Sequence, residues 1–290
     1  MHKFFIPRSD GNSPMELKAL TLQANTIRQD IIRMLTEAGS GHPGGSLGMA
    51  DIFTVLYFDF LSINPPKPDA IDRDYLVLSN GHICPVLYAT LAHRGFFPVK
   101  KLVTLRKLGS PLQGHPHREA LPGLESSSGP LGSGLSQACG MAKGLLIDGR
   151  KNRVVCLTSD GEHQEGNTWE AVLFAAKYRL SNLIEIIDRN NIQIDGRTEE
   201  VMPLGSIRDK YHAFGWHTIE IDGNDINDIK KALAEADAVA DKPSVIVAHV
   251  VPGKGVSFME NQYQWHGKAP SKEEAAQALL ELAKAREGFS

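Results

Sequence analysis

Two residues suited to binding a metal ion, Asp160 and Asn190, each follow a short apolar segment of the chain. Residues 153–158 and 183–187 are rich in β-branched side chains, which predicts two buried strands. Asp160 and Asn190 are 30 positions apart, about the length of one strand–helix–strand unit. Parallel strands joined in this way end at one edge of the sheet, where ligands of open α/β sheets bind. We therefore expect the carboxylate and the amide oxygen to converge on one point.

Carboxylate and amide oxygens are hard ligands of the kind that Mg²⁺ and Ca²⁺ prefer. Because Mg²⁺ usually binds only one or two carboxylates and takes phosphate oxygens as well, this arrangement predicts a diphosphate cofactor or substrate. A plainer interpretation is that the residues form turns, since Asp-Gly and Asn-Asn pairs at strand ends are common turn formers. The residues alone leave both interpretations open.

Five of the eleven histidines lie in glycine-rich segments: His42, His82, His115, His117 and His266. A neutral imidazole can take up a proton near neutral pH, and an imidazolium can donate to an anionic oxygen. A zinc site is disfavoured, because the His-Pro-His segment lacks the usual Cys/His spacing and a fourth ligand. For His117 we expect only an exposed or capping side chain.

The glycine-rich loop GPLGSG, residues 129–134, precedes a predicted helix but matches no nucleotide-binding pattern. The dinucleotide fingerprint G-x-G-x-x-G fails because, started at Gly132, it reaches Gln137 at its last position. The P-loop pattern G-x-x-x-x-G-K-[ST] is absent from the sequence as well. On its residues alone, the loop is a flexible connection.

Strands and helices alternate along most of the chain, which predicts an α/β domain with a mostly parallel sheet and helices on both faces. The further predicted strands are residues 75–78, 216–221 and 244–251. The predicted helices are residues 17–38, 49–61, 85–94, 136–146, 169–176, 225–240 and 272–286. We expect three regions, namely an N-terminal arm (1–14), the α/β domain (15–270) and a C-terminal helix (271–290).

The composition is that of an ordinary globular protein. The 290 residues are 42% hydrophobic and 22% charged, which argues against a disordered or membrane-spanning chain. A formal net charge of −3 includes no basic excess that would favour nucleic acid as a partner. The three cysteines lack metal-binding spacing, and residues 1–10 contain no long apolar run typical of a secretory signal. We therefore expect reduced thiols and a cytoplasmic protein.

Seven motifs between about residue 15 and residue 275 resemble those of transketolase, in the same order. They are SGHPGG (40–45), SNGH (79–82), GHP (114–116), GPLGSG (129–134), DGEHQEG (160–166), DRNNIQIDG (188–196) and WHGKAP (265–270). The segment 159–161, followed by Asn190, is similar to the thiamine diphosphate motif, usually GDG and then an Asn. Ser159 stands where the family usually has Gly, and this small side chain should leave the geometry of Asp160 intact. The resemblance implies the thiamine diphosphate-binding fold.

The resemblance also implies roles for the matching residues. The metal ion, Mg²⁺ with Ca²⁺ or Mn²⁺ as substitutes, would be bound by Asp160, Asn190 and the backbone oxygen of Ile192. The residues expected to contact the cofactor are His82, Gly129, Leu131, Gly161, Glu162, Asn190 and His266.

Four histidines carry the implied catalytic roles. His82 and His266 are expected near the phosphates and the reacting carbon, whereas His42 and His115 are expected to bind substrate hydroxyls and move protons. Glu165 and Glu170 would lie at a subunit interface in the family. An ordinary charged helix face explains this last pair as well.

The implied activity is the transfer of a two-carbon ketol unit from a ketose phosphate to an aldose phosphate, a reaction of the pentose phosphate pathway. In the family, the glutamate that activates the aminopyrimidine, the aromatic stack on that ring and the arginines that bind sugar phosphate belong to a following domain. None of these has a counterpart in this sequence. We therefore expect the N-terminal subunit of a split transketolase. A separate C-terminal subunit would complete it, in an α₂β₂ assembly.

Three alternatives stay open on the sequence. The chain could be a subunit of another thiamine diphosphate enzyme, such as a 2-oxoacid dehydrogenase, although the four histidines and GPLGSG disfavour this. It could belong to a transketolase-like enzyme for an unusual ketose, because the phosphate-binding half is missing. It could also be a non-catalytic binding protein that has kept the fold, since a fold never proves a function.

Overall fold

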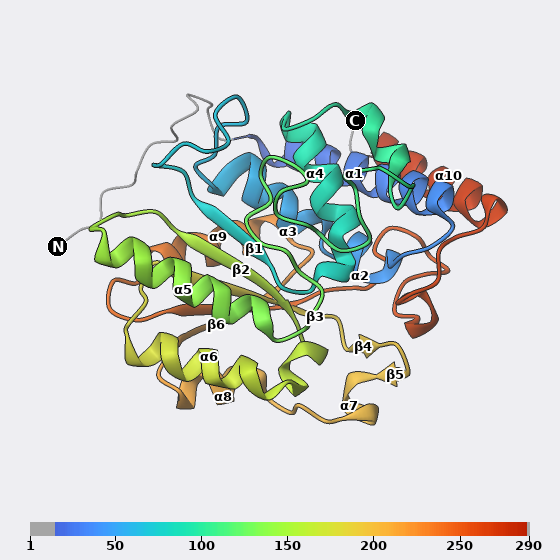
Figure 1. Ribbon diagram of the computed structural model, residues 1–290. Helices are drawn as coiled ribbons and strands as arrows, with labels where there is room; N and C mark the ends of the chain where they lie inside the picture. Colours follow the sequence, from blue (N-terminus) through green and yellow to red (C-terminus); the bar gives the residue numbers. More distant parts are fainter. Residues whose placement is uncertain (1–14, 289–290) are drawn as a thin grey trace.

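The computed structural model describes residues 15–288, which form a five-stranded parallel sheet between two layers of helices (Figure 1). The strand order is β1-β2-β3-β7-β6, and every neighbouring pair is parallel. The strands are β1 (Tyr75–Leu78), β2 (Val154–Ser159), β3 (Leu183–Arg189), β6 (His217–Asp222) and β7 (Ser244–His249). The predicted α/β class, with a mostly parallel sheet covered on both faces, is confirmed.

One face of the sheet carries the larger hydrophobic core. Its helices are α1 (Leu17–Ala38), α2 (Pro43–Gly48), α3 (Ala50–Val55), α4 (Cys84–Arg94), α9 (Ile226–Ala238) and α10 (Lys272–Gly288). The other face is covered by α5 (Ser133–Ile147), α6 (Gly166–Lys177) and α8 (Ile207–Ala213). All residues of β2 and β3 are buried, which explains why the apolar residues of both strands do not alternate with exposed polar ones.

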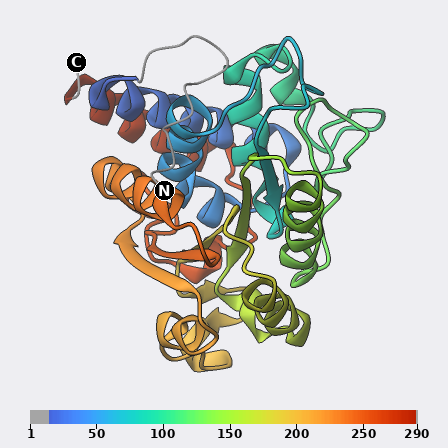
Figure 2. The ribbon, with the colours of Figure 1, turned by 90° about the vertical axis from the view of Figure 1, so that its left-hand side faces the viewer.

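Helix α1 begins and ends as its apolar periodicity predicts, and Gly39 follows it with a φ of +64°. Such a left-handed residue commonly terminates a helix, and glycine adopts it without steric cost. The C-terminal helix α10 lies beside α1 (Figure 2), and Asn25 Nδ2 donates to the backbone oxygen of Leu282 at 3.0 Å. The predicted arm, residues 1–14, lies outside the described residues.

The segment after α1 differs from the prediction. We expected a glycine-rich turn over residues 40–46 and one helix over 49–61. Instead, helix α2 begins at Pro43, and α3 is followed by a π-helix over Leu56–Phe60. Tertiary contact explains the helical glycines, because a Cβ at Gly45 would lie 2.8 Å from Ile83. Close packing between segments therefore decides a conformation that local propensity does not.

Residues 190–213 contain several short elements that the periodicity did not predict. They are the antiparallel pair β4 (Ile192–Gln193) and β5 (Gly196–Arg197), helix α7 (Thr198–Val201) and helix α8. Short 3₁₀ helices also occur at Gly81–Ile83, Val99–Thr104, Gly161–Gln164 and Tyr263–Trp265. Among the described residues, no helix is both long and apolar enough to cross a membrane.

Candidate active site

Asp160 and the segment that contains Asn190 meet at the carboxyl ends of β2 and β3. The backbone nitrogen of Asp160 donates to the oxygen of Asp188 at 3.1 Å, so the two strand ends lie side by side. The Asp160 carboxylate is 1% exposed and accepts bonds from the backbone nitrogens of Gly161 and Asn191, each at 2.7 Å. The structure thus brings the two segments together as the strand arrangement predicted.

The Asn190 amide is held in the same loop. Its Nδ2 donates to Asp188 Oδ2 at 2.9 Å, and its Oδ1 accepts from the backbone nitrogen of Ile192 at 3.0 Å. Asp188 Oδ1 is buried and has no hydrogen-bond partner. Asn191, which lies between Asn190 and Ile192, adopts a φ of +61°, a conformation that asparagine tolerates better than most residues.

These residues fit a hard divalent cation. They offer a carboxylate, a side-chain amide oxygen and a backbone carbonyl, which is the donor chemistry of Mg²⁺ and Ca²⁺. Within residues 15–288 no cluster of three His, Cys, Asp or Glu side chains suits a metal. A metal ion here would therefore need the amide and backbone oxygens in addition to the Asp160 carboxylate. Burial raises the pKa of Asp160, while Arg189, at 3.3 Å from Oδ2, and two backbone N–H groups oppose that rise.

Arg189 joins the Asp160 loop to the following segment. Its Nη2 donates to Glu199 at 2.7 Å, and Glu199 in turn accepts from the backbone nitrogens of Leu204 and Gly205 at 3.2 Å each. The guanidinium therefore neutralises the buried carboxylate and anchors residues 199–205 to the sheet edge.

Three of the four predicted catalytic histidines form a triangle. The ring centroids are 5.1 Å apart for His42 and His82, 5.2 Å for His82 and His266, and 5.6 Å for His42 and His266. The rings come from the start of α2, the turn after β1 and the turn after Tyr263–Trp265. Segments more than two hundred residues apart thus place three imidazoles at one point.

Glycines allow these histidine segments to approach one another. A Cβ at Gly44 would lie 3.1 Å from the backbone oxygen of Trp265, and one at Gly267 would lie 3.6 Å from His42 Nε2. A Cβ at Gly81 would meet the Ser128 hydroxyl at 2.5 Å. Close contact therefore favours glycine at Gly44 and Gly81, whereas Gly267 has room for a Cβ atom.

Burial keeps the triangle uncharged. It lowers the pKa of His42 to about 4, with His266, Arg106 and His115 adding to the effect. Burial also lowers the pKa of His82 and of His266. His42 Nδ1 is buried without a hydrogen-bond partner. At neutral pH these rings can accept a proton or a hydrogen bond from a ligand.

The fourth histidine, His115, is exposed beside the glycine loop. A Cβ on Gly129 would lie 3.8 Å from its Cγ, and Gly129 itself has a φ of +150°. Burial of part of the ring, followed by the charge of Arg106, lowers the pKa of His115. His117 is exposed, as expected.

The glycine loop is clamped to the Asp160 loop by Glu162. This carboxylate is fully buried and accepts bonds from the Ser79 hydroxyl, from the backbone nitrogen of Gly132 at 2.6 Å and from that of Ser159 at 3.2 Å. We predicted that Glu162 contacts the cofactor, and the structure shows that three internal donors already surround it. Gly132, with a φ of +83°, packs against Asn167, and a Cβ there would collide with the Asn167 side chain.

The remaining predicted site residues lie at the surface. Leu131 is 37% exposed, and Glu165 and Glu170 are exposed at the start of α6 and within it. Large exposed apolar side chains lie near the C-terminal ends of helices α5 and α6, and we call them the α5–α6 face. It consists of Leu146, Ile147, Leu173, Phe174 and Tyr178.

A buried polar network behind the Asp160 loop escaped the sequence analysis. It contains His163, Tyr211 and Glu185, all of them fully buried. The one available signal was the position of Glu185 inside an otherwise apolar strand, because an ionisable side chain there needs buried partners.

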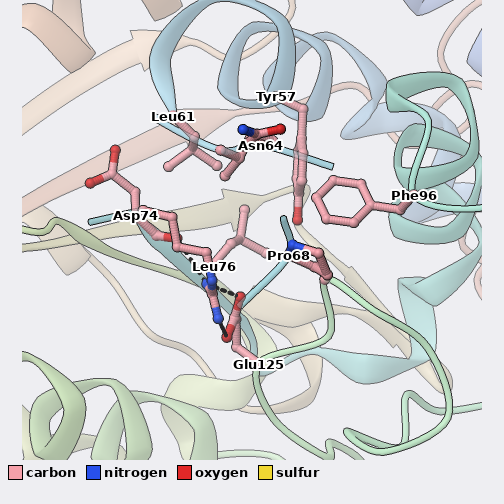
Figure 3. Close-up of a pocket in the computed structure, with 11 residues that line it drawn as sticks. Tyr57, Leu61, Asn64, Pro68, Asp74, Leu76, Phe96 and Glu125 are labelled. Atoms are coloured by element: carbon pink, nitrogen blue, oxygen red, sulfur yellow. Dashed lines mark hydrogen bonds and ion pairs between the residues drawn. The ribbon is translucent and has the colours of Figure 1, made fainter. Parts of the chain in front are cut away.

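A separate cavity lies at the opposite edge of the sheet, near the start of β1 (Figure 3). Tyr57, Phe96 and Leu76 line it, together with the ion pair between Arg73 and Glu125. Its volume of about 10 Å³ has room for roughly one water molecule. It therefore cannot hold a sugar, and the histidine triangle is the better candidate site.

A parallel sheet with oxygen donors and neutral histidines at its carboxyl edge defines an α/β domain suited to binding an anionic ligand together with a metal ion. Residues 20–289 match the family described as "Transketolase, thiamine diphosphate binding domain". The chain belongs to the transketolase family.

Relatives of two lengths support this assignment. The chain is 40% identical over 269 residues to one subunit of the apulose-4-phosphate transketolase of Phocaeicola vulgatus, covering 93% of this chain and 95% of that one. It is 40% identical over 262 residues to the 6-deoxy-6-sulfo-D-fructose transketolase subunit SqwG of a Clostridium species, covering 90% and 95%. The crystal structure of Campylobacter jejuni transketolase superposes with a TM-score of 0.86 at 32% identity, over 95% of this chain but 46% of that one.

Proposed function

We propose that this chain is the N-terminal subunit of a two-chain transketolase that transfers a two-carbon ketol unit from a ketose phosphate to an aldose phosphate. The observation that carries the proposal is the pair of coverages given above. The chain spans nearly all of a relative whose name describes it as one subunit of a transketolase, but less than half of the Campylobacter jejuni transketolase chain. The cytoplasm and the pentose phosphate pathway are the proposed setting.

The residues at the strand ends would hold the cofactor. Asp160, Asn190 and the backbone oxygen of Ile192 would bind Mg²⁺, with Ca²⁺ or Mn²⁺ as substitutes, and diphosphate oxygens would complete its coordination. Gly161 begins a turn whose backbone can approach the phosphate closely. Thiamine diphosphate, when bound, supplies a nucleophilic thiazolium carbon and an electron sink.

The histidines would bind the cofactor and the substrate, and would move protons near the reacting thiazolium carbon. His82 and His266 would lie near the phosphates and the reacting centre, and His42 and His115 would bind substrate hydroxyls. Because burial holds the pKa of His42 at about 4, its ring is neutral at pH 7 and can accept a hydrogen bond from a substrate hydroxyl. Gly129 and Leu131 would form a backbone wall beside the cofactor rings.

A separate C-terminal subunit would complete each site, in an α₂β₂ assembly. Support comes from the α5–α6 face, where Leu173 is 55% exposed, Phe174 40% and Ile147 73%. Apolar side chains grouped in this way are typical of a surface that another protein covers. Glu165, which directly precedes α6, and Glu170, which lies within it, would belong to that interface.

A transketolase-like reaction on an unusual ketose is the second candidate. The observation in its favour is that the names of two similar subunits specify apulose 4-phosphate and 6-deoxy-6-sulfo-D-fructose. Both names describe sugars with an anionic terminal group. The side chains that would select between a phosphate and a sulfonate belong to the proposed partner.

The test is reconstitution of the two-chain enzyme. The chain is purified alone and together with a candidate C-terminal subunit, and two-carbon transfer from xylulose 5-phosphate to ribose 5-phosphate is measured with thiamine diphosphate and Mg²⁺. We expect transfer only with both chains present. Activity of this chain alone would contradict the proposal, whereas activity of the complex on another ketose alone would favour the second candidate.

A further inference from the structure

Behind the Asp160 loop, three buried side chains form a hydrogen-bonded series that joins three elements. His163 Nε2 lies 2.9 Å from the Tyr211 hydroxyl, and this hydroxyl lies 2.8 Å from Glu185 Oε2. His163 belongs to the turn after β2, Tyr211 to α8 and Glu185 to the middle of β3. We call these three residues the buried relay.

Both ends of the buried relay are fixed by further partners. At one end, His163 Nδ1 lies 2.8 Å from the backbone oxygen of Ser159, which can only accept. At the other end, the Thr158 hydroxyl donates to Glu185 Oε1 at 2.8 Å. His163 Nδ1 must therefore carry a hydrogen, and its Nε2 can be either a donor or an acceptor.

Only two proton arrangements satisfy every bond of the relay. In the first, neutral His163 accepts at Nε2 from Tyr211, whose oxygen accepts from a protonated Glu185. In the second, a charged His163 donates to Tyr211, which donates to an ionised Glu185. A neutral His163 beside an ionised Glu185 leaves two acceptors facing each other. Both allowed arrangements therefore hold one proton more than neutral His163 beside ionised Glu185 would.

Burial selects the first arrangement. Separated charges inside a protein are costly unless their pairing is excellent, and Nε2 of His163 lies 3.7 Å from Glu185 Oε1 without a direct bond. Burial raises the pKa of Glu185 to about 8; the hydrogen bonds with Tyr211 and Thr158 oppose this rise, and Glu162 adds to it. Cys156 and Cys139, also close by, have pKa values raised by burial and are neutral thiols.

The relay reaches the proposed cofactor site through the backbone. The nitrogen of His163 donates to the oxygen of Asp160 at 2.9 Å, and its own oxygen accepts from Trp169 Nε1 at 2.9 Å. His163 also directly follows Glu162, which clamps the glycine loop. A shift of the His163 ring would therefore move the turn that presents Asp160 and Gly161.

We propose that Tyr211 and a protonated Glu185 are positioning residues, which act through His163 to hold the Asp160 turn in the geometry that binds Mg²⁺ and thiamine diphosphate. The inference rests on the proposed function for the identity of the ligand. None of the three side chains is a catalytic residue, since all of them lie behind the loop and are fully buried.

Two isosteric variants separate the proton arrangements. Glu185→Gln keeps a donor toward Tyr211 and an acceptor for Thr158, so it mimics the protonated acid. Tyr211→Phe removes the central hydroxyl and leaves His163 Nε2 and Glu185 Oε2 without a partner. Tyr57→Phe is the matched control, because Tyr57 is also buried but lies at the opposite edge of the sheet.

The experiment measures thiamine diphosphate saturation in the assembled two-chain enzyme at fixed Mg²⁺. Tyr211→Phe should raise the half-saturating cofactor concentration about tenfold or more, as expected for a buried bond whose partners stay unsatisfied, while kcat at saturating cofactor changes little. Glu185→Gln and Tyr57→Phe should stay within about threefold of the wild type, because they leave no buried group unsatisfied near the turn. Equal losses in Glu185→Gln and Tyr211→Phe would refute a protonated Glu185, and unchanged saturation in Tyr211→Phe would refute positioning.

A second measurement does not depend on the fate of Tyr211→Phe. The difference infrared spectrum between the wild-type chain and Glu185→Gln should contain the carbonyl band of a buried protonated carboxylic acid at neutral pH. Absence of that band would overturn the assignment. A wild-type complex that binds no thiamine diphosphate would instead refute the proposed function and leave the proton arrangement to be decided by the spectrum.

Discussion

Replacement of Glu162 by glutamine provides a direct test of how the glycine loop is held. The carboxylate accepts from three donors, two of them backbone nitrogens that cannot turn away. In Glu162→Gln one oxygen becomes an NH₂ group. Whichever way the amide is oriented, it faces a backbone N–H of either Gly132 or Ser159. One buried donor then has no acceptor.

The expected loss of stability follows from these contacts. A buried donor left unsatisfied costs about 1–3 kcal/mol, and bonds to a charged acceptor are stronger than those to a neutral amide by about 1 kcal/mol. We therefore expect Glu162→Gln to lower the free energy of unfolding by about 2–4 kcal/mol. For a domain whose total stability is about 5–15 kcal/mol, this is a large share.

Urea unfolding of the isolated chain, followed by tryptophan fluorescence without thiamine diphosphate or Mg²⁺, measures this loss. Glu170→Gln is the matched control, because Glu170 is exposed and its replacement should change stability by less than about 0.5 kcal/mol. A side chain whose main role is to contact cofactor would not affect the chain in the absence of cofactor. An unfolding free energy for Glu162→Gln equal to that of Glu170→Gln would refute our account of the clamp.

Three further predictions concern the metal site, the histidines and the partner. Asp160→Ala should weaken Mg²⁺-dependent binding of thiamine diphosphate about 100-fold in a calorimetric titration of the complex, and unchanged affinity would exclude the metal role. Because the pKa of His42 falls from 6.5 when unfolded to about 4 when folded, the unfolded chain binds more protons between these values. The free energy of unfolding should therefore decrease as the pH falls from about 6.5 to 4, and His42→Gln should make this decrease smaller in urea titrations. An equal pH dependence in the wild type and in His42→Gln would contradict the prediction. Phe174→Glu should abolish co-elution with the C-terminal subunit in size-exclusion chromatography while leaving the melting temperature of the isolated chain unchanged, and retained co-elution would place the interface elsewhere.

The sheet was predictable because its signals are local. Continuous apolar runs such as residues 183–187 indicate strands buried on both sides, and Asp160 and Asn190 follow such runs directly. The handedness and direction of a strand–helix–strand unit then place both residues at one edge. Helix α1 was equally accessible, since its apolar stripe and Gly39 are both encoded within the segment itself.

The details of the site depend on contacts between distant segments. Helix α2 contains three glycines, which propensity disfavours in a helix, and its packing against Ile83 and Val250 requires the absence of Cβ atoms. Glu162 and the buried relay are bonded to partners tens of residues away, so no local pattern reveals which residues those partners are. The sequence grouped His42, His82 and His266 in one site only through its resemblance to a family, because no spacing rule connects the three histidines.

The strand order of the sheet has a consequence for how the chain folds. Tyr75 pairs with Val154, and Ile184 with Ser244, so neighbouring strands are separated by 79 and 60 positions. Sheets built from such non-local pairs fold slowly, because the entropy of closing long loops is lost before the contacts form. The three imidazoles, contributed by segments near both ends of the chain, can meet only when this assembly is complete. Proximity of His42 to His266 is thus a late event in folding, and a natural reporter of the finished native state.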